Sequence, residues 1–168
     1  MKRVAALVDR PRTLARNRLV VIAPRNDEAV GSIADLGKKG VRLVLAASSV
    51  PVGAYAREAF ANLAKDRAFG EGFAARVQAN VVSEETDVKA VATKIALGEG
   101  DAGVVYATDV APIAAKVRVL RFPPGVAPEA AYPIASLKAA ANAAGGQAFV
   151  AFITSPAGVA FLKARGFE

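Results

Sequence analysis

The sequence predicts an α/β fold with a mostly parallel sheet. Short aliphatic, β-branched runs alternate with segments of helical spacing along most of the 168 residues, which is typical of strand–helix–strand units. Hydrophobic residues make up 54% of the chain and charged residues 22%. This composition allows a buried core and excludes a disordered chain. No apolar run reaches the roughly 20 residues that span a bilayer.

The first 64 residues predict helices and strands in alternation. Residues 18–23 form a β-branched run closed by Pro24, which predicts a buried strand. The spacing of apolar residues and the positions of Ser32 and Pro51 predict helix starts nearby. In chain order we expect a helix at 2–8, a strand at 18–23, a short helix at 32–36, a strand at 42–46 and a helix at 52–64.

The rest of the chain repeats the pattern. Gly98 ends one helical segment, Pro123 and Gly125 turn the chain, and Ser155-Pro156 opens the last helix. In chain order we expect a strand at 81–82, a helix at 87–97, a buried strand at 103–107, a strand nearer an edge at 117–122, a strand at 131–137 and helices at 145–153 and 156–165.

The residue inventory excludes several classes of chemistry. The chain has no Cys and no His, so thiol chemistry, thiolate metal sites and histidine-dependent triads are absent. An enzyme that works through carboxylates, with Glu84, Glu85 or Asp109 as acid or base, stays an open alternative.

The net charge of +7 is concentrated at one end. Residues 1–25 hold seven basic residues against Asp9 alone, a net charge of +6, and the remaining chain carries +1. A basic module for nucleic acid in residues 1–25 is therefore an alternative. No aromatic residues interleave with these charges, so a solvated basic surface is the simpler interpretation. The apolar run after Met1 is too short for a signal peptide.

Three places could bind an anion, because parallel sheets bind ligands at the carboxyl ends of their strands. At the first place, Pro51 suits the first position of a helix. Val52 then presents a backbone N–H without a helical partner, and Gly53 leaves room for a ligand. An ordinary helix start is the alternative interpretation.

The second and third places have the same character. Thr86 can cap a helix, Asp87 favours the positive end of its dipole, and Val88 presents an N–H in the first turn. Tyr106 ends a strand, where its hydroxyl can donate to an anion. Ordinary capping and a packed tyrosine are the alternatives here.

These segments, taken in order, resemble one family. Residues 50–59 resemble a "VPAGxYAxEAL" segment, 85–91 an "E-x-D-V-R-x-A" segment and 103–109 a "GIVYxSD" segment. Residues 155–167 resemble a closing "SPEG…YGF", and 13–21 a first crossover strand. The family is that of the extracytoplasmic molybdate-binding proteins, the oxyanion receptors of ABC transporters. The resemblance covers nearly the whole chain.

The resemblance implies a periplasmic-binding-protein-like (type II) fold of two α/β lobes with the ligand between them. It implies a periplasmic receptor, not an enzyme, without a cofactor, which binds molybdate or tungstate and docks on ABC membrane subunits. Val52 and Val88 would donate backbone N–H groups and Tyr106 its hydroxyl, supported by Pro51, Gly53, Thr86 and Asp87. Residues 20–107 would form the second lobe, and residues 1–19 and 108–168 part of the first.

The resemblance also implies that the chain lacks the first segment of the first lobe, which carries two hydroxyl-bearing clusters in the family. We therefore expect weakened oxyanion binding and self-association through the incomplete lobe. A small-molecule sensor domain of similar two-lobe architecture is a further alternative.

Overall fold

The computed structural model describes residues 7–168 and divides into two compact units. Unit 1 is formed by Met1–Asn17 and Glu129–Glu168, and unit 2 is Arg18–Pro128. The helix expected at 2–8 lies outside the described residues apart from its last two positions. There, Val8 forms an antiparallel bridge with Leu137.

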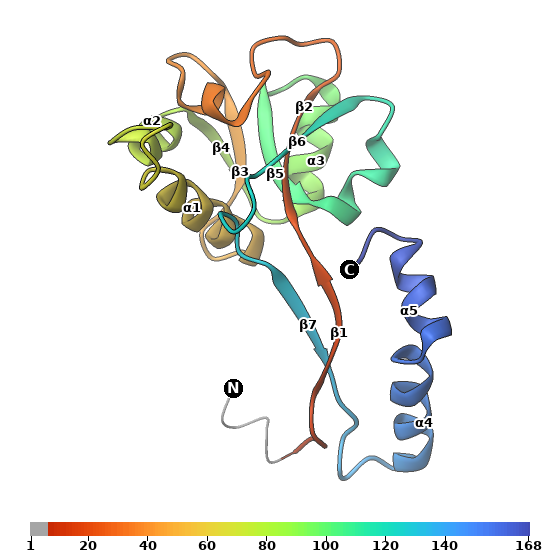
Figure 1. Ribbon diagram of the computed structural model, residues 1–168. Helices are drawn as coiled ribbons and strands as arrows, with labels where there is room; N and C mark the ends of the chain where they lie inside the picture. Colours follow the sequence, from red (N-terminus) through yellow and green to blue (C-terminus); the bar gives the residue numbers. More distant parts are fainter. Residues whose placement is uncertain (1–6) are drawn as a thin grey trace. The chain divides into compact units, whose positions relative to one another are not determined.

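A mixed five-stranded sheet forms the centre of unit 2, in the order β4-β3-β5-β2-β6 (Figure 1). β3 pairs in parallel with both β4 and β5, whereas β2 pairs antiparallel with β5 and β6. The strands are β2 (Leu19–Pro24), β3 (Leu43–Ala46), β4 (Val81–Glu85), β5 (Ala102–Tyr106) and β6 (Val117–Arg121).

The sheet is mostly parallel, as expected. β6 runs against β2 and therefore shares the direction of β3, β4 and β5, so that β2 alone runs in the opposite direction. β2 begins at Leu19, which lies opposite Tyr106 at the end of β5. A strand that begins where its neighbour ends must run in the opposite direction, so β2 is antiparallel to β5. The edge position expected for the strand at 117–122 is confirmed, because β6 is the last strand in the order.

Helices and one dense core complete unit 2. Its core holds buried apolar residues from β2, β3, β5 and β6 and from α1, α2 and α3, and Val81 of β4 packs against it. Ile22, Leu43 and Ile95 are completely buried. Helical segments are η1 (Ile33–Gly37), α1 (Pro51–Leu63), α2 (Phe73–Ala79), α3 (Val88–Leu97), η2 (Ala107–Asp109) and η3 (Ala111–Ile113). The sequence does not predict α2, a seven-residue helix that buries Phe73 and Val77.

The expected boundary after residue 107 is wrong. The structure keeps residues 108–128 in unit 2, since β6 pairs with β2 from Val20 to Pro24. The side chain of Arg25 reinforces this join, because its guanidinium donates to the carbonyl oxygens of Ala114 and Ala115 at 2.7 and 2.9 Å. The chain passes from unit 2 to unit 1 after Pro128.

Unit 1 has a thin sheet and little core. Its strands β1 (Arg12–Asn17) and β7 (Ala130–Ile134) pair antiparallel, followed by α4 (Ala143–Ile153) and α5 (Pro156–Lys163). Glu168 adds to β1 through two backbone hydrogen bonds with Arg16 of 2.7 and 2.9 Å. Within residues 7–168, no single helix is long and apolar enough to cross a membrane, although α4 and α5 together reach that length and composition with a 62° bend between them.

Candidate functional site

The topology of unit 2 brings the three predicted anion-binding places to one edge of its sheet. β4, β3 and β5 are parallel neighbours, so their carboxyl ends lie at the same edge. α1 follows the end of β3, α3 follows the end of β4, and Tyr106 is the last residue of β5. Ligands of α/β sheets bind at such an edge. That one ligand contacts all three places stays a prediction.

The start of α1 presents backbone donors on a rigid base. Pro51 occupies the first helical position, and the N–H of Ala54 donates to Val50 O at 3.0 Å. Val52 and Gly53 precede Ala54, so helix geometry gives their N–H groups no carbonyl one turn earlier. The Val52 side chain is buried in the core of unit 2, which fixes the direction of its N–H.

Gly53 has a packing role that the sequence does not predict. A Cβ atom at this position would lie 2.2 Å from the carbonyl oxygen of Ala47 and 2.3 Å from that of Ala46. The glycine is needed because α1 lies against the end of β3, and its role in ligand access stays a prediction. The sequence pattern alone could not distinguish these two reasons.

Arg57 holds this first turn in place. Its guanidinium donates to the carbonyl oxygens of Ala46 and Gly53 at 3.0 and 2.9 Å and pairs with Glu84 of β4. One side chain therefore ties α1 to β3 and β4. Sequence reasoning missed Arg57. Its place four residues after Gly53, on the same helix face, was the available signal.

The start of α3 is capped by Asp87, not by Thr86 as expected. The Asp87 carboxylate accepts from the N–H of Ala90 at 2.9 Å. Asp87 has an extended backbone with φ −154° and ψ 166°, which is the usual cap conformation. Thr86 is exposed outside the helix. Val88 is the first helical residue, and its N–H has no intrahelical partner.

Tyr106 is held by the short turn that follows it. Its backbone N–H donates to the Asp109 carboxylate at 3.1 Å, and Tyr106 is only partly exposed. Burial raises the pKa of Asp109, and the hydrogen bond from Tyr106 opposes that shift. Asp109 thus positions the backbone of Tyr106. The two residues are three positions apart, which allows this hydrogen bond but does not predict it.

The carboxylates considered for catalysis all have structural partners. Glu84 pairs with Arg57, and Asp109 accepts from the Tyr106 backbone. Glu85 accepts from Lys94 at 2.7 Å and from the Ser83 hydroxyl at 2.5 Å. The bond from Lys94, and then that from Ser83, lowers the pKa of Glu85. In the described part of the chain, no group of three or more acidic residues is placed to hold a metal ion.

Comparison with known proteins identifies the family. Residues 2–168 match the family of bacterial extracellular solute-binding proteins. The chain belongs to this family. The molybdate-binding proteins ModA of Mycobacterium tuberculosis and Mycobacterium bovis are 35% identical to it over 162 residues, which is 96% of the chain. The chain spans 58% of the length of these curated relatives.

Two solved structures show how widely the fold occurs. The substrate-binding domain assigned to a molybdenum ABC transporter of Clostridium difficile superposes with a TM-score of 0.81 and 26% identity, and the match covers the whole chain and 72% of that domain. PEB3 bound to L-phospholactate has a TM-score of 0.79 at 12% identity, covering 94% of this chain and 68% of that one. At 12% identity only the fold is shared. The expected periplasmic-binding-protein-like α/β fold is confirmed.

Proposed function

We propose that this member of the solute-binding family forms the oxyanion-binding part of an ABC importer receptor. Its ligand is molybdate or tungstate, and it acts outside the cytoplasmic membrane without catalysis or a resident cofactor. Unit 2 corresponds to the second lobe, and unit 1 contributes to the first. The observation that carries the proposal is the shared sheet edge of α1, α3 and Tyr106, in a chain 35% identical to molybdate-binding proteins.

The donors at this edge suit a dianion. Val52 and Val88 stand in the first turns of two helices, where unpaired N–H groups and the helix dipole favour negative charge. The Tyr106 hydroxyl adds a neutral donor at the end of β5. Donors fixed by backbone geometry can distinguish tetrahedral oxyanions by size, which mobile cationic side chains do less well. The Asp87 carboxylate at this edge already accepts from Ala90.

The basic first 25 residues give less support to nucleic-acid binding. Arg25 donates to carbonyl oxygens of residues 114, 115 and 117, and Arg16 pairs with Glu129 at 2.7 Å. These two cations therefore stabilise the chain itself. The proposed partners are the oxyanion and the membrane subunits of the importer.

Titration calorimetry at physiological salt tests the proposal. We expect molybdate and tungstate to bind in preference to sulfate, phosphate and L-phospholactate. The expected dissociation constant is in the tens of micromolar or weaker, because the resemblance assigns further donors to a lobe segment that is not among these residues. Absence of binding by either metal oxyanion at millimolar concentration would contradict the proposal.

One substitution tests the role of Val88 directly. Val88→Pro removes the N–H donor and keeps the helix start, because proline is favoured at the first helical position and the extended Asp87 backbone is compatible with a following proline. We expect at least a tenfold weaker dissociation constant, since hydrogen bonds to charged groups contribute about 1.5–3 kcal/mol each. Val88→Ala keeps the N–H and is the matched control. Equal affinities of the two variants would remove Val88 from the site.

A further inference from the structure

The two helices whose first turns carry the proposed donors are each tied to β4 by one ion pair. Arg57 of α1 pairs with Glu84, and Lys94 of α3 pairs with Glu85 at 2.7 Å. Each cation is the seventh residue of its helix, and the two carboxylates are the last two residues of β4. The end of one strand therefore holds both helices, at the sheet edge of the proposed site.

The two pairs lie on opposite faces of the sheet. Neighbouring residues of a strand point to opposite faces, so the side chains of Glu84 and Glu85 diverge. The topology agrees, because the connection from β3 to β4 and the connection from β4 to β5 run in opposite directions along the strand order. Since connections between parallel strands are right-handed, α1 and α3 cover opposite faces. Each ion pair thus fixes one helix against the same strand end.

Each cation also contacts a second group, so that it fixes a direction as well as a distance. The Arg57 guanidinium donates to the carbonyl oxygens of Ala46 and Gly53 at 3.0 and 2.9 Å. The Lys94 ammonium donates to the Ser83 hydroxyl at 3.0 Å, and this hydroxyl in turn donates to the carboxylate of the pair at 2.5 Å. The two cationic side chains are only 23% and 34% exposed, so salt and water screen these contacts less than those of a fully exposed pair.

We propose that the Arg57–Glu84 and Lys94–Glu85 pairs are positioning residues, which together set the distance between the first turns of α1 and α3 and thereby the size of oxyanion that the site accepts. This role rests on the proposed function of the site. Donors must be held within about 0.5 Å of the productive geometry to act on one ligand. Neither pair needs to contact the ligand, because each acts through the backbone N–H groups of its helix.

Long-range attraction between the two cations and a dianion is the competing explanation. The two explanations make opposite predictions for the carboxylates. Removal of a negative charge near the site should strengthen dianion binding if Coulomb interaction alone matters, and should weaken it if the carboxylate holds a helix in place. Glu84→Gln and Glu85→Gln keep the shape of the side chain and remove its charge, so the sign of the change in affinity decides between them.

The Arg42–Asp101 pair provides a matched control in the same unit. Its length is also 2.7 Å, and the Asp101 carboxylate accepts from the backbone N–H and the guanidinium of Arg42. Arg42 precedes β3 and Asp101 precedes β5, so this pair lies at the amino ends of the parallel strands, at the opposite edge from the proposed site. Asp101→Asn therefore removes a carboxylate and an ion pair without disturbing either helix start.

Calorimetric titration of the full chain with molybdate and with sulfate measures affinity and selectivity. We expect Glu84→Gln and Glu85→Gln each to weaken molybdate binding at least about threefold, the scale of coupling within one ion-pair network. Both should also reduce the preference for molybdate over sulfate, and Asp101→Asn should change neither value. Stronger molybdate binding by the glutamine variants, or the affinity and selectivity of the parent chain in both, would overturn this inference alone. A parent chain that binds neither molybdate nor tungstate would contradict the proposed function and this role with it.

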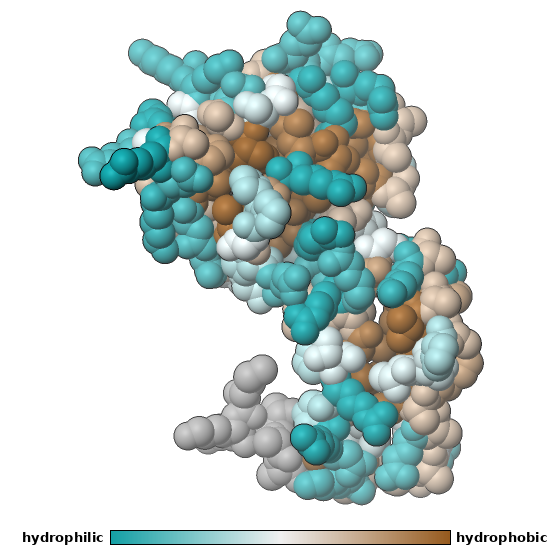
Figure 2. Space-filling model, viewed as in Figure 1, coloured by the Kyte–Doolittle hydropathy of each residue, from teal (hydrophilic) through white to brown (hydrophobic). Residues whose placement is uncertain are grey.

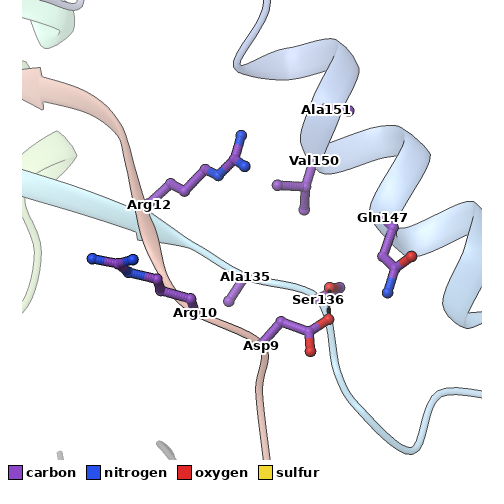
Figure 3. Close-up of a pocket in the computed structure, with 8 residues that line it drawn as sticks. All are labelled: Asp9, Arg10, Arg12, Ala135, Ser136, Gln147, Val150 and Ala151. Atoms are coloured by element: carbon purple, nitrogen blue, oxygen red, sulfur yellow. Dashed lines mark hydrogen bonds between the residues drawn. The ribbon is translucent and has the colours of Figure 1, made fainter.

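A hollow in unit 1 is a second place that could attract a dianion. Its volume is about 280 Å³, and its lining includes Arg10 and Arg12. In Figure 3 the Arg12 side chain extends toward α4. Asp9 also lines the hollow, where its carboxylate accepts from the Ser136 hydroxyl at 2.5 Å and would repel an anion. The titration therefore needs a readout that locates the ligand.

Amide chemical shifts at saturating molybdate provide this readout and separate positioning from a general loss of stability. Glu84→Gln should reduce the ligand-induced shift mainly at the Val52 N–H. Glu85→Gln should reduce it mainly at the Val88 N–H. A merely structural role would reduce both shifts equally in both variants, and that result would overturn the inference. Shifts confined to residues around the hollow of unit 1 would also overturn it, because the ligand would then bind away from α1 and α3.

Discussion

Unit 2 buries most of its large apolar side chains, whereas the large apolar side chains of α4 and α5 in unit 1 are exposed (Figure 2). Unit 2 contains every large residue of the hydrophobic core cluster, but the buried hydrophobic residues of described unit 1 are Ala15 and Ala130. Burial of apolar surface is the main favourable contribution to folding. Unit 2 therefore has the larger stabilising contribution from its core, while the described part of unit 1 buries little apolar surface.

Core truncation should give the largest contrast between the units. Phe73 of α2 is 1% exposed and packs edge-on against Phe69 with ring centroids 5.0 Å apart. Phe73→Ala should lower the free energy of unfolding by about 3–5 kcal/mol. Phe152→Ala in unit 1 should change it by less than about 0.5 kcal/mol in the isolated chain.

Denaturant unfolding monitored by circular dichroism measures both values. The contrast between the units would be contradicted if Phe152→Ala lowered the free energy of unfolding as much as Phe73→Ala, because Phe152 would then be buried in solution. A concentration dependence of the Phe152→Ala effect would identify self-association as the cause.

The sequence was most informative where local chemistry determines structure. Pro51, Asp87 and Gly98 bound helices whose apolar faces repeat at helical spacing, so α1 and α3 were predicted within one or two residues. α2 was missed because only Phe73 and Val77 are buried in it, and two apolar positions do not establish a period. Its existence depends on tertiary packing.

Strand direction and the unit boundary depend on contacts between distant residues. The antiparallel pairing of β2 with β5 joins Leu19 to Tyr106, which no local pattern encodes. β6 was recognised as a strand, but its pairing with β2 was not, and so the boundary after residue 107 was wrong. For the candidate site, the sequence indicated Val52, Val88 and Tyr106. The role of Arg57, and that of Asp109 in holding the Tyr106 backbone, emerged only from the structure.

Two glycines at close backbone contacts, one in each unit, allow a second comparison of how tightly the two units are packed. A Cβ at Gly53 would lie 2.2 Å from Ala47 O, and one at Gly158 of α5 would lie 2.3 Å from Ile153 O. Gly53→Ala should cost about 1–3 kcal/mol, because α1 is held by the core and cannot shift freely. Gly158→Ala should cost less, since α5 can move with little loss of burial.

Thermal unfolding of the two variants, with Gly31→Ala as the control, measures these effects. A Cβ at Gly31 would meet its nearest atom at 3.6 Å, an ordinary contact. Equal losses of stability in Gly53→Ala and Gly158→Ala would mean that α5 is packed as tightly as α1. That result would contradict the expected difference in packing between the two units.

The smallest effect concerns acid stability, and it should arise in unit 2. Lys38, and then Ser32 with the N–H groups of Ser32 and Gly31, lower the pKa of Asp35 to about 2 against the opposing effect of burial. A carboxylate with a lowered folded pKa stabilises the protein fully above the unfolded pKa of about 3.9. That contribution is lost as the pH falls toward 2.

We therefore expect Asp35→Asn to be less stable than the parent chain above about pH 4, with the difference disappearing near pH 2. Because Lys38 is largely exposed at 67%, the difference should be only about 1 kcal/mol. Denaturant unfolding across this pH range provides the measurement, and Lys38→Ala should remove part of the same difference. A gap between parent and Asp35→Asn that stays constant down to pH 2 would show that the amide perturbs packing and that the charge of Asp35 is not the cause.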